Sequence, residues 1–313
     1  MKYEEFKTKV EEKFMEYIPD RYQHLKLEII PVNKINKEID GIRLVGKGVT
    51  VVPIIYVNQI YEYYKRCGSF DMSVEYAAKI MAEHMDEKFP KLAELSFEKE
   101  YAKDKIVFQL INTEQNRKML DDIPHRQFLD LSVIYRLVVS VDDGKIGSTV
   151  INNDSVKLLN MTEEELFNNA ARNTIEMFPA DVKTLEEVLK DIAIKDGMPE
   201  EIAGNMFSDS LPFYLISNDI GINGASVMLY ERVLFDIASR LKESTLYILP
   251  SSIHEVIAVS ASIDMELDEI ASMVAEVNSD AVLLEERLSN NIYIYDKEKR
   301  KISLATDTNK KLD

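Results

Sequence analysis

Apolar residues in this chain switch repeatedly between two spacings, and the switching limits the folds it can adopt. Phe6, Val10 and Phe14 recur every four residues, as they do on one face of a helix. Leu25 and Leu27 recur every two residues, as they do on one face of a strand. The two patterns interleave without a regular strand–helix–strand repeat, which does not fit a doubly wound parallel sheet. The predicted class is α+β, with mixed or antiparallel sheets and hairpins packed against amphipathic helices.

Local turn and capping signals mark where several elements begin and end. Asp142-Asp143-Gly144 stands between two alternating apolar runs, 129–141 and 145–151, which is typical of a β-hairpin. Thr162, with Glu165 three residues later, has the pattern of a capping box and predicts the start of a helix. Further strands are expected over residues 49–57, 246–249 and 256–259, and further helices over 227–241 and 267–277.

The chain has 313 residues, enough for one large domain or two of ordinary size. The segment 94–104 is charged and has no strong apolar period, so it is the best candidate for a boundary. It divides the sequence into an N-terminal α+β part, residues 1–100, and a C-terminal α+β part, residues 101–313. No linker rich in Gly, Pro or Ser separates the two parts, so they are expected to pack together as one unit.

Negative charge is concentrated in two segments. The chain has 38 Lys and Arg against 55 Asp and Glu, a net charge of −17. Residues 161–210 carry twelve acids and four bases, and residues 251–290 carry nine acids and one base, so each segment contributes −8. A field of this sign repels phosphate backbones and anionic lipids, which disfavours direct nucleic-acid binding and a membrane role. The partner that it would attract is a basic protein.

The candidate partner-binding residues are the acids at the starts of two predicted helices. A second interpretation stays open, in which these acids form a solvated face that keeps the chain in solution. Charge alone does not separate docking from solvation, and the oligomeric state is left undetermined. The candidate residues are Glu163, Glu164, Glu165, Asp264, Glu266, Asp268 and Glu269.

Cysteine and histidine are scarce, which bears on compartment and cofactors. Cys67 is the only cysteine, so no intrachain disulfide can form, as is usual in a reducing cytoplasm. The four histidines include no HxH, HxxxH or HExxH pair, so neither a metal site nor a cofactor is predicted. The first residues are charged throughout, and no apolar run reaches the roughly 18 residues that a membrane span needs. The predicted location is the cytoplasm.

The segment Pro250-Ser251-Ser252-Ile253-His254-Glu255 contains the only candidate catalytic residues, Ser252, His254 and Glu255. If residues 252–256 are extended, Ser252 and His254 point to one side, where the imidazole could accept the hydroxyl proton. Glu255 then points away, so a distant acid would have to orient the imidazole. The structural alternative is that the serine satisfies a turn amide and the histidine makes a single hydrogen bond at a sheet edge.

Residues 221–226, Gly-Ile-Asn-Gly-Ala-Ser, join a predicted strand to a predicted helix. Glycines at such a junction can bring backbone N–H groups close to an anion. The lysine of a P-loop and the glycine spacing of a dinucleotide site are both absent. A structural turn, with Ser226 as the helix cap, is therefore preferred.

Several of these segments together resemble an uncharacterised domain-of-unknown-function family, family number 5688, whose members occur mainly in Clostridia. The segments are 40–42, 54–58, 162–166 with 173–174, 221–225 and 249–256, and the resemblance extends from Tyr3 to about Leu304. It implies a bacterial cytoplasmic protein without an assigned activity, and it supplies no catalytic or ligand residues.

Two functional hypotheses follow from the sequence. The first is an acidic, non-catalytic binding or regulatory protein whose helices meet a basic partner. The second is a hydrolase-like enzyme that uses Ser252 and His254. The concentrated charge and the shortage of catalytic motifs favour the first.

Overall fold

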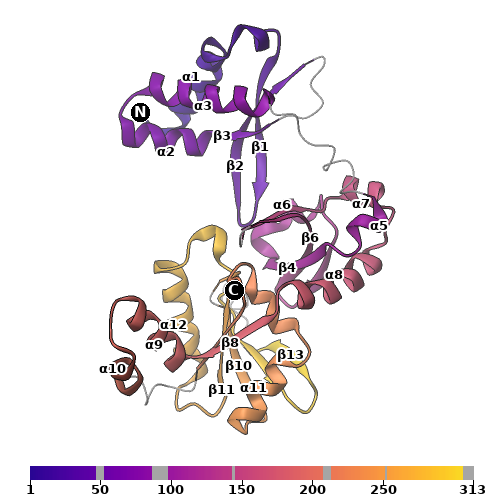
Figure 1. Cartoon of the computed structure of the whole chain (residues 1–313), viewed down its shortest axis with the longest axis vertical. Coiled ribbons are helices and arrows are strands. Elements are labelled where there is room, and N and C mark those ends of the chain that lie inside the picture. The colour runs from indigo at the N-terminus through magenta and orange to yellow at the C-terminus, as the bar shows by residue number, and fades with distance from the viewer. Residues whose placement is uncertain (47–52, 87–97, 143–144, 207–212, 251, 306–313) are drawn as a thin grey trace, which may run out of the picture. The chain divides into compact units, whose positions relative to one another are not determined.

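A computed structural model of the chain describes residues 1–46, 53–86, 98–142, 145–206, 213–250 and 252–305. It contains two compact units, Met1–Glu94 and Leu95–Asp313, which are described separately (Figure 1). The described strands pair antiparallel in both units and helices pack on the sheets, so the predicted α+β class is confirmed. The predicted division after residue 100 lies close to the boundary between the units.

Among the described residues of the N-terminal unit, a three-stranded sheet and three α-helices enclose an apolar core. The predicted helical stripe is confirmed at Phe6 and Val10 of α1, which are fully buried in a cluster that includes Ile42 and Val74. Phe14 is buried in the same cluster but begins a 3₁₀ helix, Phe14–Tyr17. The elements are α1 (Tyr3–Lys13), β1 (Lys26–Lys34), β2 (Lys37–Val45), β3 (Ile55–Tyr56), α2 (Val57–Cys67) and α3 (Phe70–Asp86).

The tyrosine-rich segment after β3 corrects one prediction. The strand expected over 49–57 is wrong at its end, because Val57 is the first residue of α2. Its first four residues lie outside the described part of the chain. Tyr61 and Tyr64 of α2 each place their ring centre 5.2 Å from that of Phe6. Packing against α1 therefore favours a helix from Val57 onward and outweighs the strand preference of the β-branched residues.

The first sheet of the C-terminal unit is built around β6, whose residues are nearly all buried as far as Val138. β4 pairs with one edge of β6, whereas β5 and β7 pair with the other. The pairing of β6 with β7 confirms the predicted hairpin, although its turn residues 143–144 lie outside the described part of the chain. The strand β5 was not expected. The strands are β4 (Ile106–Asn112), β5 (His125–Phe128), β6 (Leu131–Asp142) and β7 (Lys145–Val150), and the helices are α5 (Lys99–Ala102), α6 (Arg117–Leu120), α7 (Asn153–Leu159) and α8 (Glu163–Met177).

A six-stranded sheet forms the rest of this unit, with helices against both faces (Figure 1). Alternate residues of β10 face opposite sides: Leu246 and Ile248 join the core beneath α11, whereas Tyr247 and Leu249 pack with α12. The strand order is β13 (Lys301–Leu304), β12 (Tyr293–Asp296), β10 (Thr245–Leu249), β11 (Val256–Ser260), β9 (Tyr214–Asn218) and β8 (Ala180–Thr184), and the helices are α9 (Leu185–Lys195), α10 (Glu200–Met206), α11 (Val233–Leu241) and α12 (Leu267–Asp280).

The helix expected over 227–241 is wrong in its first half. Gly224–Leu229 is a 3₁₀ helix, and α11 begins only at Val233. Ser226 is not a helix cap, since its hydroxyl accepts a hydrogen bond from the amide of Leu110 at the free edge of β4. A contact 116 residues away in sequence therefore fixes this hydroxyl.

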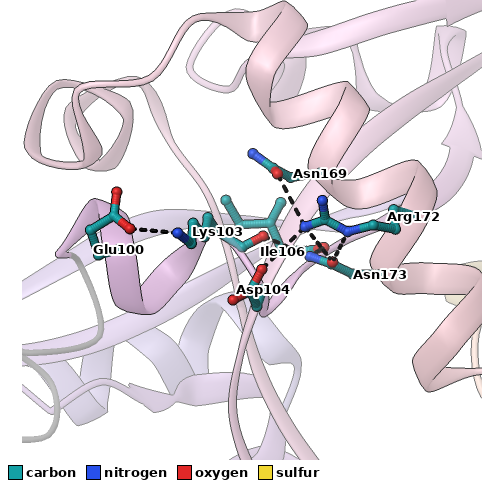
Figure 2. A network of polar contacts seen from close by, with 7 residues as sticks. All are labelled: Glu100, Lys103, Asp104, Ile106, Asn169, Arg172 and Asn173. Carbon is teal, nitrogen blue, oxygen red and sulfur yellow. Dashed lines mark hydrogen bonds and ion pairs between the residues drawn. The ribbon is translucent and has the colours of Figure 1, made fainter.

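A buried asparagine fastens α8 to the start of β4 (Figure 2). Asn173 is 2% exposed, and its side-chain amide donates to the carbonyls of Lys103, at 2.8 Å, and Ile106, at 2.9 Å. Next to it, the guanidinium of Arg172 donates to Asp104 at 3.1 Å on the surface. The amide thus satisfies two carbonyls where the chain enters the strand.

Candidate functional site

The turn after β9 and the segment before β11, two of the segments that the sequence singles out, meet in the structure. We call residues 217–225 together with 252–255 the His254 junction. Ser217 Oγ donates to the carbonyl of His254 at 2.8 Å, and the amide of Ala225 donates to the carbonyl of Ile253 at 3.2 Å. A Cβ on Gly224 would lie 2.4 Å from the carbonyl oxygen of His254, so only glycine fits this crossing of two main chains.

Both ring nitrogens of His254 have defined neighbours. Nδ1 accepts a hydrogen bond from the amide of Asn223 at 3.2 Å, so this nitrogen carries no proton. Nε2 lies 3.6 Å from Oε1 of Glu286. The side chain is 27% exposed, which places the imidazole at the edge of the unit.

The hydroxyl of Ser252 also has a main-chain partner. Residues 252–255 form a bend, and β11 begins only at Val256, so the premise of an extended segment is wrong. Ser252 Oγ accepts from the backbone amide of His254 at 3.0 Å, and the amide of Ser252 donates to the carbonyl of Glu255 at 3.2 Å. The bend therefore brings the hydroxyl to a backbone N–H and not to an imidazole nitrogen.

A small pocket lies on the inner side of the junction, and sequence reasoning missed it. Asn223, whose amide bonds to His254, lines the pocket together with residues of β4, β6, β7 and α8. The volume is about 40 Å³. Among the described residues, Arg136, on β6, is the one charged side chain that lines it. A single arginine within the otherwise uncharged run 131–141 is the sequence signal that could have indicated this pocket.

The acids at the start of α8 contact neighbouring side chains. Glu163 accepts two hydrogen bonds from the guanidinium of Arg126, at 3.1 and 2.8 Å, and a third from the hydroxyl of Tyr135. Burial alone would raise the pKa of Glu163, but the hydrogen bonds from Arg126 and Tyr135 outweigh it and lower that pKa. Glu165 accepts from Lys99 at 2.8 Å and closes the predicted capping box on Thr162.

The acids at the start of α12 have different surroundings. Asp264, Glu266, Asp268 and Glu269 are all exposed. Among the described residues, no Lys or Arg forms an ion pair with Asp264, Glu266 or Glu269. Glu266 and Glu269 form a capping box with each other's backbone, which leaves their charge at the surface.

Comparison with known proteins places the chain in a family. A sequence profile for DUF5688, a family of unknown function, matches residues 3–297. The chain belongs to this family. No curated protein and no solved structure matches the DUF5688 chain.

Two classes of site are not found in the described part of this DUF5688 protein. No group of three or more His, Cys, Asp or Glu residues there could hold a metal ion. None of the helices in those residues is both long enough and apolar enough to cross a bilayer. The remaining candidates are the His254 junction, the pocket at Arg136 and the acidic surfaces of α8 and α12.

Proposed function

We propose that this DUF5688 protein is a non-catalytic binding protein that docks a basic partner on the surface of α12. The observation that carries the proposal is a continuous stripe on that helix. Glu269, Met273 and Val277 follow one another at intervals of four residues, and all three are exposed. Residues four apart lie on one face of a helix, so the stripe joins the acids of the first turn to an apolar surface.

Exposed apolar side chains occur on the helix and again in the chain just after it. Met273 is 38% exposed and Val277 is 47% exposed. Leu283 and Leu284, just after the helix, are 60% and 49% exposed. Exposed apolar side chains gathered beside charged ones are typical of protein–protein contacts. The partner that fits is a segment with basic residues at one end and apolar residues at the other.

The start of α8 supports docking less well than the start of α12. Glu163 and Glu165 already neutralise Arg126 and Lys99, so a partner would have to displace these ion pairs. Glu164 is the exposed member of the three. We therefore assign partner binding to Asp264, Glu266, Asp268 and Glu269, and a structural role to Glu163 and Glu165.

The alternative is a hydrolase that uses Ser252 and His254, and it receives less support. The imidazole nitrogen that could deprotonate the hydroxyl must lie within about 3.2 Å of it. Instead Nδ1 accepts from Asn223, and Nε2 is next to Glu286. The hydroxyl itself accepts from the main chain. These contacts are typical of side chains that stabilise a loop and not of a nucleophile paired with its base.

Neutralising the α12 acids tests the proposal. The variant D264N/E266Q/D268N/E269Q removes four charges, and E11Q/E12Q/E16Q/E75Q removes four from exposed positions of the N-terminal unit as a matched control. A partner captured by the wild-type protein from lysate is purified and titrated by calorimetry. We expect the α12 variant to bind at least tenfold more weakly and the control to bind with wild-type affinity. Added salt should weaken binding by the wild-type protein, because it screens the acids. Equal affinity of both variants would reject the assignment.

The apolar half of the surface needs its own variant. M273S/V277S leaves every charge in place and removes the exposed apolar contacts of the stripe. We expect this variant to bind the same partner more weakly than the wild type at both low and high salt, because ions do not screen apolar contacts. A variant that binds as well as the wild type would limit the docking surface to the acids.

A further inference from the structure

Arg136 is a partly buried cation for which the described residues supply no carboxylate partner. It stands in the centre of the first sheet, opposite Val107 of β4 and Val150 of β7. Its guanidinium takes part in no ion pair among the described residues. Burial lowers the pKa of this guanidinium. Buried charges are normally paired, so an uncompensated arginine is unusual.

The hydrogen bonds of Arg136 leave part of the guanidinium available. Nε donates to Ser148 Oγ at 2.9 Å, Nη1 donates to Gln109 Oε1 at 3.3 Å, and Nη2 donates to the carbonyl of Ser148 at 3.0 Å. All three acceptors are neutral. A guanidinium has five N–H groups, so one remains on each terminal nitrogen. Two N–H groups on neighbouring nitrogens form the fork that binds both oxygens of a carboxylate.

The walls of the pocket beside Arg136 are mostly apolar. Val138, Ile146, Phe178 and Ile220 line it. Ile222 also lines it and is 44% exposed, so the pocket reaches the surface at the loop of the His254 junction. A volume of about 40 Å³ holds roughly three water molecules. That space suits an oxyanion group with a short hydrocarbon tail.

Three polar groups that line the pocket already have hydrogen-bond partners, and an acid lies nearby. Thr174 Oγ1 donates to the carbonyl of Ala170, and the hydroxyl of Tyr230 bonds to main-chain carbonyls of α8 and its end. The side-chain amide of Asn218 bonds to the backbone of Ile222 through both of its atoms. Asp219 is close enough to help raise the pKa of Tyr230, and its charge opposes a dianion. The negative charge of Asp219 therefore disfavours phosphate and sulfate more than a monoanion.

We propose that this pocket binds a small aliphatic monocarboxylate. Its two oxygens accept from the free N–H groups on Nη1 and Nη2 of Arg136, and its tail contacts Val138, Ile146 and Phe178. The site is separate from the α12 surface, so the test of this proposal does not depend on the proposed function. It also lies against Asn223, whose amide holds the His254 imidazole.

Calorimetry with simple anions tests this site in the full-length protein. The probes are the sodium salts of acetate, propionate and butyrate, with inorganic phosphate as the comparison, all at one ionic strength. We expect saturable binding of propionate or butyrate at one site per chain. The variant R136Q should bind at least tenfold more weakly, because it loses the charge and the fork. The control R172Q changes the same residue type on the surface and should bind like the wild type.

A second measurement needs no variant, so it applies even if R136Q fails to fold. Butanedione modifies arginine side chains, and peptide mass spectrometry reports which residues have reacted. Propionate should protect Arg136 and leave the modification of Arg172 unchanged. The proposal is overturned if no carboxylate binds to the wild type, if folded R136Q binds as well as the wild type, if propionate fails to protect Arg136, or if phosphate binds more tightly than the carboxylates.

Discussion

Replacing Glu163 by alanine separates a structural role for this acid from a docking role. Its carboxylate accepts from Arg126 and from the hydroxyl of Tyr135, a residue with no exposed surface. Loss of the half-exposed ion pair with Arg126 costs about 0.2–1 kcal/mol. The buried hydroxyl of Tyr135 loses its acceptor, which costs about 1–3 kcal/mol. The free energy of unfolding of the C-terminal unit should therefore fall by about 1–4 kcal/mol.

Urea unfolding followed by circular dichroism measures this loss, with the transitions of the two units fitted separately because a single two-state fit does not describe two units. A second substitution isolates the buried hydroxyl. In the double variant E163A/Y135F no orphan hydroxyl remains, so the double variant should lose less stability than the two single variants added together. A loss below about 0.5 kcal/mol for E163A, or additive losses in the double variant, would refute the structural assignment of Glu163.

Three further outcomes follow from the same contacts. The difference in unfolding free energy between wild type and E163A should shrink below pH 4.5. The native pKa of Glu163 is lowered, so the stabilisation by its carboxylate is lost as pH falls through that pKa. A pH-independent difference would contradict this. G224A should lose about 1–3 kcal/mol through overlap with main chain, whereas G204A, with open space around its Cβ, should not be destabilised. D130A should lose about 3 kcal/mol in urea unfolding, since the hydroxyl of buried Tyr293 donates to Asp130 at 2.9 Å; a loss under about 1 kcal/mol would argue against that bond.

Local signals in the sequence predict much of this fold. The stripe that begins at Phe6, the capping box at Thr162 and the hairpin of β6 with β7 each depend on residues near one another in the chain, and all three are confirmed. The predictions fail where distant packing decides. Val57 enters a helix whose tyrosines cover Phe6, and Ser226 bonds to a strand edge far away in sequence.

The candidate sites show the same difference between local sequence signals and the packing of distant residues. Residue types alone indicate that Ser252 and His254 are worth testing, but the bend that turns the hydroxyl toward the main chain depends on a junction with residues 217–225. The acids of α8 and α12 look alike in the sequence, and only the fold brings Arg126 to Glu163. The pocket at Arg136 combines residues from β4 to Tyr230. The lone arginine of β6 could indicate a site, but no local pattern could have outlined its walls.

Labelling with a fluorophosphonate tests most directly whether the protein acts by binding and not by nucleophilic catalysis. This probe reacts with serine hydroxyls that a neighbouring base activates, and intact-mass and peptide mass spectrometry locate the adduct. The contacts of Ser252 and His254 predict no adduct at Ser252 under conditions that fully label a known serine hydrolase in the same tube. An adduct at Ser252 that disappears in H254A would contradict this account.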